Sequence, residues 1–476
     1  MNGTRKTKIQ DELVALAQES SHIPTSHYGR YNVKRGLRNA NGTGVLVGLT
    51  EVGNVVGYDM VQGEKHPCHG RLYYRGYGLD DLCRGFLQEG RFGFEETIYL
   101  LLFGGLPTTS QLRDFQEVLA SCRSLPEGFT ENMILKIPSK DIMNKIQRSV
   151  LVLYSHDDEP DRTDIANVVR QSIELIARFP TIISYGYQAK AHYFDDQSLF
   201  IHKPQSHLST AENILHMIRP DNAYSPVEAE VLDLCLVIHA EHGGGNNSTF
   251  ATHVVSSSGT DTYSAISAAV GSLKGHKHGG ANNRVRDMID NIRLHVPNWQ
   301  DPTALKAYLA KILDKEAYNG EGLVYGMGHA VYTLSDPRAE LLKQKAWELA
   351  VEKDALDVFA LYANIEGLTK ALIQERKGDH VHIAANVDLY SGFVYEMLGI
   401  PPELYTPLFA TARIAGWCAH RMEQIASDQK IIRPAYKTVG APRSYTSMGD
   451  RTPPTVFGEE GSQAGSQPLS YGELTG

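Results

Sequence analysis

The stretch RLYYRGYGLDDLCRGFLQEG, residues 71–90, marks the place where the apolar pattern of the chain changes. Its first part, RLYYRGY (71–77), is typical of a short strand because aromatic residues dominate it. From residue 79 onward apolar residues recur every three to four positions, which predicts amphipathic helices. On the N-terminal side, GVLVGLTEVGNVVGYDMVQG (44–63) is rich in valine and glycine and predicts short strands joined by tight turns. We therefore expect a mainly α-helical chain with a small β portion near its N-terminus.

The helical spacing continues through most of the remaining sequence. Helix starts support it: Ser225, Pro226 and Glu228 combine an N-cap serine, a proline at the first helical position and a glutamate three residues after the cap. Residues 6–20 have an amphipathic pattern that predicts a peripheral helical arm. The other stretches with helical spacing are 79–89, 93–104, 108–122, 164–187, 226–241, 261–273, 302–314, 338–352, 355–374, 387–398 and 404–426.

Composition narrows the class of protein. Of 476 residues, 42% are hydrophobic and 21% are charged, which are ordinary values for a globular protein. The net charge of −9 argues against a long polyanion such as DNA as the main partner. No apolar run approaches the roughly 18 residues that cross a bilayer. The start, MNGTRKTKIQDELVALAQES, has no hydrophobic signal core, and the five cysteines form no CxxC pair. We expect a soluble, cytoplasmic protein with free thiols.

Several histidines lie in unusual local sequences. His239-Ala240-Glu241-His242 ends an apolar helical stretch and precedes GGGNNST. A His-x-x-His pair on a helix can bind a metal, but this is not the HExxH arrangement, and neither a cysteine nor a further carboxylate lies at ligand spacing. Contact with a polar ligand and a plain helix-end role are the other interpretations. We expect no metal site.

Two further histidines are flanked by glycines. In GHKHGGAN (275–282) glycines on both sides of His278 let the backbone approach a ligand closely, although a helix–helix turn is the alternative. In GMGHAVY (326–332) His329 follows two glycines, and Arg338 opens the next helix after Asp336-Pro337.

A carboxylate and two arginines complete the set. Asp388 in NVDLYSG (386–392) lies at an expected helix start, where capping is the simplest alternative role. Arg413 lies in the apolar stretch FATARIAGW, and Arg433 lies in IIRP; a guanidinium suits a carboxylate partner. Together these residues indicate proton-transfer chemistry on an anionic substrate, and no Walker A sequence, GxGxxG fingerprint or zinc quartet competes with that interpretation.

At these residues the sequence resembles the citrate synthase family. The resemblance covers about residues 43–437. It is carried, in family order, by GRLYYRGYGLDDL, EETIYLLLFGGLPT, HAEH with NNST, SSGTD, GHKHGGAN, GMGHAVY with DPRAE, NVDLYSG, FATARIAGW and IIRP.

The resemblance implies a two-domain helical fold with the active site in the cleft between the domains. The N-terminal arm is 1–42, and the large domain consists of 43–285 and 394–437. The small domain is 286–393, and 438–476 is a C-terminal extension whose end we expect to be mobile. A homodimer or higher oligomer is also implied, because the last arginine of the site comes from the neighbouring subunit.

The resemblance also implies catalytic roles. His278 would donate to the thioester oxygen of acetyl-CoA while Asp388 removes a methyl proton. His329 would donate to the ketone oxygen of oxaloacetate as the new bond forms, and citryl-CoA would then be hydrolysed. Acetyl-CoA is a substrate here, and no cofactor is expected.

Four residues are implied as ligands of the oxaloacetate carboxylates: His242, Arg338, Arg413 and, across the dimer, Arg433. Thr333 departs from the family pattern, where a basic residue usually helps hold the CoA phosphate, so Lys274 and Lys277 are the candidates for that contact. The Gly-Pro that usually precedes the catalytic histidine is replaced by Gly275-His276.

The leading interpretation is citrate synthase. A 2-methylcitrate synthase that uses propionyl-CoA is the nearest alternative, because one methylene is worth only about 1–3 kcal/mol in a pocket. A non-catalytic binding protein of the same family belongs to a different class, and the filled reacting positions argue against it.

Overall fold

The computed structural model describes residues 3–62, 64–378, 380–427 and 430–451. The chain forms two compact units, Met1–Ile432 and Arg433–Gly476. In the described part of the second unit the chain is largely exposed and contains one short 3-10 turn, η4 (Met448–Asp450). The end that we expected to be mobile lies mainly in 452–476, outside the described residues.

A three-stranded antiparallel sheet forms the β portion. Strands β1 (Gly53–Val61) and β2 (Glu64–Tyr74) pair along their length, and β3 (Tyr77–Gly78) pairs with the end of β2. Arg75 and Gly76 between β2 and β3 both have positive φ (49° and 86°), which makes the tight turn. The predicted small β portion is confirmed.

The first half of the valine- and glycine-rich stretch does not form a strand. The ladder begins at Gly53, and the residues before it make one isolated bridge, between Gly44 and Arg38. Leu46 and Leu49 are 83% and 89% exposed. The composition favours extended backbone there, but a strand needs a paired neighbour, which composition cannot supply.

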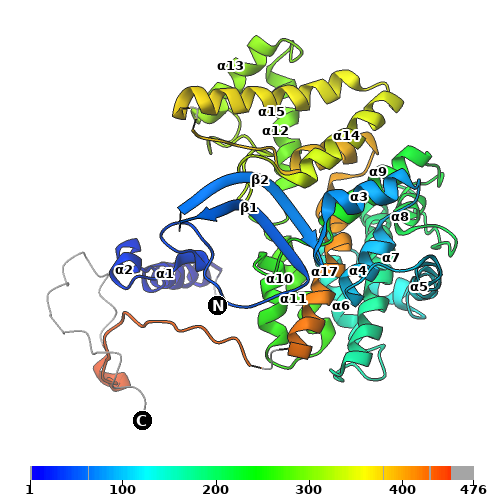
Figure 1. Cartoon of the computed structure of the whole chain (residues 1–476). Helices are drawn as coiled ribbons and strands as arrows, with labels where there is room; N and C mark the ends of the chain where they lie inside the picture. The colour runs from blue at the N-terminus through cyan, green and yellow to red at the C-terminus, as the bar shows by residue number, and fades with distance from the viewer. Residues whose placement is uncertain (1–2, 63, 379, 428–429, 452–476) are drawn as a thin grey trace. The chain divides into compact units, whose positions relative to one another are not determined.

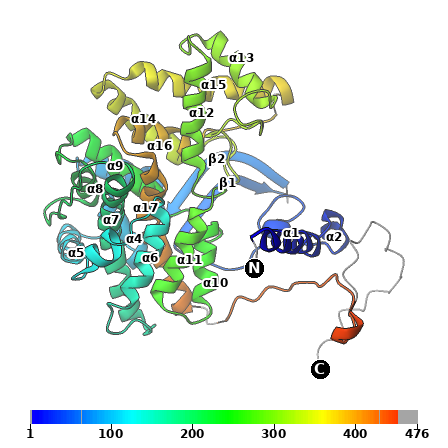
Figure 2. The ribbon, with the colours of Figure 1, turned by 180° about the vertical axis from the view of Figure 1, so that it is seen from behind.

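The helical prediction is confirmed along the chain (Figures 1 and 2). Ser225 caps α9 and forms the expected capping box with Glu228. The helices are α1 (Gly3–Ser20), α2 (Thr25–Arg30), η1 (Arg35–Leu37), α3 (Leu79–Gln88), α4 (Phe94–Phe103), α5 (Thr109–Cys122), η2 (Thr130–Leu135), α6 (Ile142–Tyr154), α7 (Ile165–Phe194), α8 (Thr210–Ile218), α9 (Pro226–His239), α10 (Asn247–Ser256), α11 (Thr262–Lys274), α12 (Ala281–His295), α13 (Pro302–Leu313), α14 (Pro337–Glu352), α15 (Leu356–Lys377), α16 (Val387–Met397), η3 (Pro402–Leu404) and α17 (Tyr405–Ser427).

Helices α2, α6, α8, α10 and α12 were not predicted. Helix α12 is mostly polar in sequence, and its apolar residues Val285, Met288, Ile289 and Ile292 are buried. Their spacing of three and four is a helical signal that could have located this helix.

Within the first unit, α17 lies among α4, α7, α9, α10 and α11, and it carries the fully buried Trp417 and Arg413. In both views α12–α15 form a separate group of helices on the other side of β1 and β2 (Figures 1 and 2). The expected division into 43–285, 286–393 and 394–437 stays a prediction.

Two strand glycines bring the sheet against the loop that precedes α14. A Cβ on Gly57 would overlap the carbonyl oxygen of Val331, and one on Gly70 would overlap that of Ser335. Ser335 Oγ also accepts from the Gly70 amide at 3.2 Å. The sheet therefore supports the segment that carries His329 and leads to Arg338.

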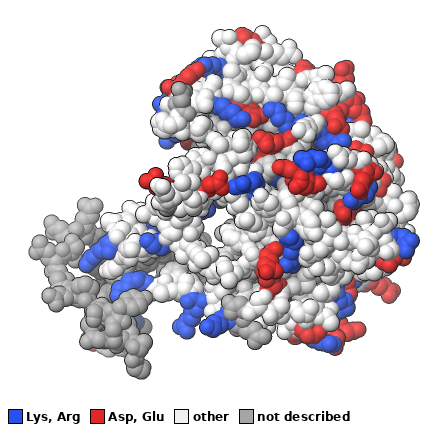
Figure 3. All heavy atoms as spheres, viewed as in Figure 1, with Lys and Arg blue, Asp and Glu red and all other residues white. Residues whose placement is uncertain are grey.

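The charged side chains on the surface and the length and hydropathy of the helices can be compared with what the sequence predicts. Over the helices at the top and right of Figure 3, basic and acidic side chains are interspersed. Among the helices that the structure describes, none is long and apolar enough to cross a membrane.

Candidate active site

Four predicted substrate-contacting residues from separate elements meet in the first unit. His242 follows α9, His329 lies in the loop before α14, Arg338 is in the first turn of α14 and Arg413 is in the middle of α17. The rings of His242 and His329 are 5.3 Å apart between centroids, and Arg338 Nη2 lies 3.5 Å from His329 Nε2. The fold therefore brings together four residues that are far apart in the sequence.

Arg338 is held by a buried aspartate. Its Nε and Nη2 donate to Asp336 Oδ1 and Oδ2 at 3.0 and 2.7 Å, and Asp336 also caps α14 by accepting from the Arg338 amide. Both side chains are almost fully buried. The Asp336 carboxylate raises the pKa of Arg338 although burial opposes it, so the guanidinium stays charged and its direction is fixed.

Arg413 is fully buried, yet part of its guanidinium has no partner. Nε donates to the His239 carbonyl oxygen at 2.7 Å, whereas Nη1 and Nη2 contact no acceptor among the described residues. Burial lowers the pKa of Arg413 to about 10, which still leaves it charged at neutral pH. Nε2 of the buried His242 also lacks a partner within the described part of the chain. Such orphaned donors suit a carboxylate ligand.

His329 has its tautomer set by the backbone. Its Nδ1 accepts from the amides of Val331 and Tyr332 at 3.0 and 3.2 Å, so the hydrogen of the neutral ring is on Nε2. Burial, assisted by the nearby Arg338 charge, lowers the pKa of His329 to about 4. At neutral pH this ring is an uncharged N–H donor that points toward Arg338.

His278 forms a hydrogen bond with Ser248, which lies in the first turn of α10. Ser248 Oγ lies 3.0 Å from His278 Nε2 and accepts from Trp417 Nε1 at 3.1 Å. The serine hydroxyl can donate either to His278 or to Asn246 Oδ1 at 3.0 Å; when it donates to His278, the imidazole hydrogen is left on Nδ1. Burial lowers the pKa of His278 to about 4, with a smaller contribution from Arg413.

Asp388 lies in the first turn of α16, and this turn is tied to the His329 loop. Asn386 caps the helix by accepting from the Asp388 amide at 3.1 Å, and its Nδ2 donates to the Gly328 carbonyl at 2.9 Å. Burial raises the pKa of Asp388 to about 6, and the Arg338 charge limits that rise. The aspartate is thus more basic than usual and is still mostly ionised at neutral pH.

Sequence reasoning missed Tyr332. Its ring stacks on His329 with centroids 4.7 Å apart, meets His242 edge-on at 5.6 Å, and lies 5.7 Å from the Arg338 guanidinium. The hydroxyl is buried and has no partner among the described residues. A tyrosine three residues after the histidine of GMGHAVY was the available signal. Asp336 and Ser248 were also missed as supporting residues, although both lie in the quoted motifs.

The two lysines proposed for CoA have other surroundings. Lys274 forms an ion pair with Asp141 at 3.0 Å, and Lys277 is exposed, so their contact with CoA phosphate stays a prediction. Thr333 Oγ1 lies 3.5 Å from the Gly57 carbonyl oxygen. Arg433 begins the second unit, and its role also stays a prediction. Within the described residues, no group of three or more His, Cys, Asp or Glu side chains is arranged to hold a metal ion.

Comparisons with known proteins agree with one another. The family described as citrate synthase, C-terminal domain, matches residues 40–435. The citrate synthase of Haloferax volcanii is 33% identical over 413 residues, which are 86% of this chain and 96% of that protein. The 2-methylcitrate synthase 2 of Corynebacterium glutamicum is 33% identical over 85% of this chain and 94% of its own length.

Solved structures give the same result. A ternary complex of the Thermoplasma acidophilum citrate synthase with carboxymethyl coenzyme A and oxaloacetate has a TM-score of 0.71 at 27% identity, and covers 88% of this chain and 99% of that one. The Pyrobaculum aerophilum citrate synthase has a TM-score of 0.69 at 29% identity, covering 86% and 94%.

Proposed function

This chain belongs to the citrate synthase family, and we propose that the cluster described above condenses acetyl-CoA with oxaloacetate and then hydrolyses citryl-CoA to citrate and CoA. The enzyme is an acyl-transferring transferase that makes citrate. One observation carries the assignment of the site: the buried, unpartnered terminal nitrogens of Arg413 and Nε2 of His242 lie in the same cluster as Arg338 and His329.

Oxaloacetate has two carboxylates, and the proposed ligands match them. Arg338, held by Asp336, presents a fixed charge, and Arg413 has both terminal nitrogens available for a bidentate contact. His242 would add a neutral donor, because burial and Arg338 lower its pKa well below the ordinary value. Arg433 of the partner subunit is proposed as the last ligand, in a homodimer or higher oligomer.

The proposed reaction begins at the thioester. The Asp388 carboxylate removes a proton from the methyl group of acetyl-CoA while a His278 N–H donates to the thioester oxygen, which gives the enol or enolate. Its carbon attacks the ketone carbon of oxaloacetate and forms the new C–C bond. His329 Nε2–H donates to the ketone oxygen as that oxygen becomes an alkoxide. Water then cleaves the thioester of citryl-CoA and releases CoA.

The electrostatics of the site support these roles. Burial holds the pKa values of His278 and His329 near 4, so both rings are neutral donors rather than cations at the working pH. Burial also raises the pKa of Asp388, which strengthens it as a base toward a very weak carbon acid. The same dry surroundings strengthen each hydrogen bond to the developing oxyanion.

Two finer points complete the proposal. We place the enzyme in the cytoplasm, a proposal supported by five free cysteines in the part of the chain that the structure describes. We also propose that it needs no cofactor and no metal, so that activity survives treatment with a chelator.

The test is a comparison of rates with acetyl-CoA and propionyl-CoA, each with oxaloacetate, measured by release of the free CoA thiol. We expect the higher kcat/KM with acetyl-CoA. A reversed preference would make the protein a 2-methylcitrate synthase, as some relatives are named. No turnover of either thioester by the folded protein would leave the non-catalytic alternative.

A further inference from the structure

Glu241 lies inside the HAEH turn, between two residues that contact the proposed oxaloacetate site. Its side chain is fully buried, and Oε1 accepts both from the Gly243 amide and from His420 Nε2, the latter at 3.0 Å. The Glu241 carboxylate therefore binds the backbone of its own turn, at Gly243, and connects that turn to α17, which carries His420.

His420 connects Glu241 to a second histidine. Its Nδ1 lies 3.2 Å from His253 Nε2, and His253 Nδ1 lies 2.9 Å from Gln424 Oε1. His420 Nδ1 also lies 3.5 Å from Thr50 Oγ1, so the ring has polar neighbours on both edges while its Nε2 donates to the Glu241 carboxylate.

The space around the carboxylate is shaped by glycines. A Cβ on Gly53, at the start of β1, would lie 2.7 Å from Glu241 Oε1 and 2.8 Å from its Cγ. A Cβ on Gly416 of α17 would overlap Glu241 Oε2. Contacts this short are not tolerated between real atoms, so both elements admit the glutamate only because they have glycine there.

The turn that Glu241 holds carries two contacts of the site. The carbonyl oxygen of His239 anchors Arg413 through Nε at 2.7 Å, and His242 is the next residue after Glu241. Tyr74 Oη donates to the Val237 and Glu241 carbonyls at 3.0 and 3.3 Å, so the backbone is fixed from a second side. A shift of this turn would therefore displace both Arg413 and His242.

We propose that Glu241 and His420 are positioning residues for oxaloacetate: their buried pair fixes turn 239–243 and, through it, the guanidinium of Arg413 and the ring of His242. This inference rests on the proposed function. It assigns no contact with acetyl-CoA and no chemical step to the pair, so its effect falls on one substrate.

The test uses Glu241→Gln and His420→Asn in the full-length enzyme. Glu241→Gln removes the negative charge and leaves only a neutral amide oxygen to accept from His420, and His420→Asn removes the ring nitrogen that donates to Glu241. We expect the KM for oxaloacetate to rise about tenfold in each, the size of effect that loss of a charged hydrogen bond gives, with kcat within about threefold and the KM for acetyl-CoA within about twofold. Since the two residues act as a unit, the double variant should also show about tenfold rather than about a hundredfold.

Two further variants distinguish positioning from general damage. Gly53→Ala changes no charge but pushes on Glu241, so it should raise the KM for oxaloacetate in the same way. Asp157→Asn is the matched control: its side chain is only 3% exposed and accepts from Arg170, Gln171 and Tyr263 at 2.6, 2.8 and 2.8 Å. It should lower the melting temperature and leave the KM for oxaloacetate unchanged.

An unchanged KM for oxaloacetate in the folded variants overturns the inference. So does an equal loss across kcat and both KM values, or a hundredfold effect in the double variant. If Glu241→Gln does not fold, His420→Asn and Gly53→Ala decide the matter by the same criteria. An inactive wild-type enzyme would instead count against the proposed function, because these comparisons all start from wild-type turnover.

Discussion

At the scale of single residues, Asp388 combines a raised pKa with a place next to the His329 loop. Asp388→Asn keeps the size of the side chain but removes its ability to accept a proton. We expect kcat to fall at least about 100-fold, in line with typical general-base contributions, while oxaloacetate binding is retained. Steady-state rates and calorimetric titration with oxaloacetate check this. Condensation at nearly the wild-type rate would remove Asp388 from the mechanism.

The pH dependence follows from the same carboxyl group. Asp388 must be ionised to act as a base, and burial raises its pKa to about 6. Activity should therefore be present above pH 6 and decline as the pH falls through 6, well above the range of an ordinary aspartate. A profile of kcat/KM for acetyl-CoA between pH 4.5 and 8 shows this. A profile flat down to about pH 4.5 would contradict it.

Tyr332 offers a test of the proposed oxaloacetate site. Its hydroxyl is buried without a partner among the described residues, a state that costs about 1–3 kcal/mol. Tyr332→Phe keeps the stacking on His329, so we expect a higher melting temperature in the absence of ligand and a KM for oxaloacetate about tenfold higher. Thermal melting with and without oxaloacetate measures both effects. An unchanged KM would mean that the hydroxyl does not bind the substrate.

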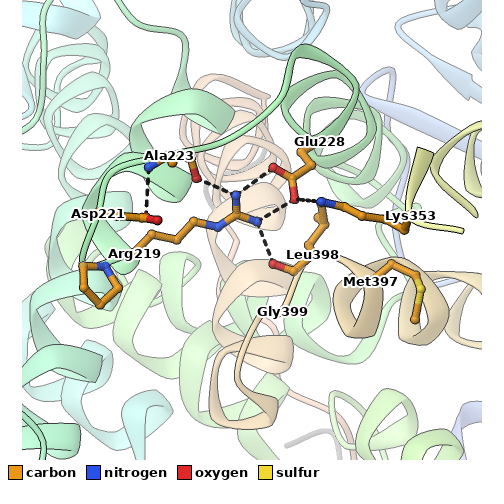
Figure 4. Close-up of a pocket in the computed structure, with 9 residues that line it drawn as sticks. Arg219, Asp221, Ala223, Glu228, Lys353, Met397, Leu398 and Gly399 are labelled. Carbon is orange, nitrogen blue, oxygen red and sulfur yellow. Dashed lines mark hydrogen bonds and ion pairs between the residues drawn. The ribbon is translucent and has the colours of Figure 1, made fainter. Parts of the chain in front are cut away.

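At the scale of elements, an ion-pair cluster joins α9 to α14, which pack against each other. Arg219, just after α8, donates to both oxygens of Glu228 at 2.7 and 3.0 Å and to the Leu398 carbonyl at 2.7 Å. Lys353, at the end of α14, donates to the same glutamate at 2.6 Å (Figure 4). The cluster lines a pocket of about 470 Å³, and it holds the start of α9 to the end of α14, the helix that carries Arg338.

The stability that this ion-pair cluster gives the protein should depend on pH through the charge of Glu228. Hydrogen bonds from Arg219 and Lys353 hold the pKa of Glu228 at about 2 despite the opposing effect of burial, below its ordinary value of 4.5. A lowered folded-state pKa gives stability that is present above pH 4.5 and is lost as the pH falls toward 2. Glu228→Gln should therefore destabilise the protein by about 3 kcal/mol at pH 7.

The measurement is the difference in melting temperature between wild type and Glu228→Gln. It should be constant between pH 7 and pH 5 and begin to shrink below about pH 4.5. A difference that grows as the pH falls would show that the charge of Glu228 does not stabilise this junction.

At the scale of the whole molecule, the proposed contribution of Arg433 across a dimer can be tested by complementation. Chains with Arg433→Ala and chains with His278→Ala should each be nearly inactive alone. After subunit exchange, a heterodimer contains one site free of both changes, and a random mixture should recover about a quarter of wild-type activity. Activity is assayed once mass spectrometry has confirmed exchange. No recovery would place Arg433 outside a shared site.

Much of the local architecture was predictable because it depends on neighbouring residues. The capping box of Ser225 and Glu228 and the helical spacing of α17 both act over a few positions, where sequence and conformation are closely linked. Residues 44–52 were misassigned, since extended structure there depends on a partner strand elsewhere.

The sequence by itself determined the helical class, the family and the residue types of the active site, because each is encoded in short motifs that can be recognised one at a time. Only the tertiary structure decided which side chains are buried and unpartnered. The orphaned donors of Arg413, the pKa of Asp388 near 6 and the pairing of Glu241 with His420, which is 179 positions away, all arise from packing between distant elements. Desolvation and hydrogen bonding depend on what surrounds a group in space, and adjacency along the chain does not specify that.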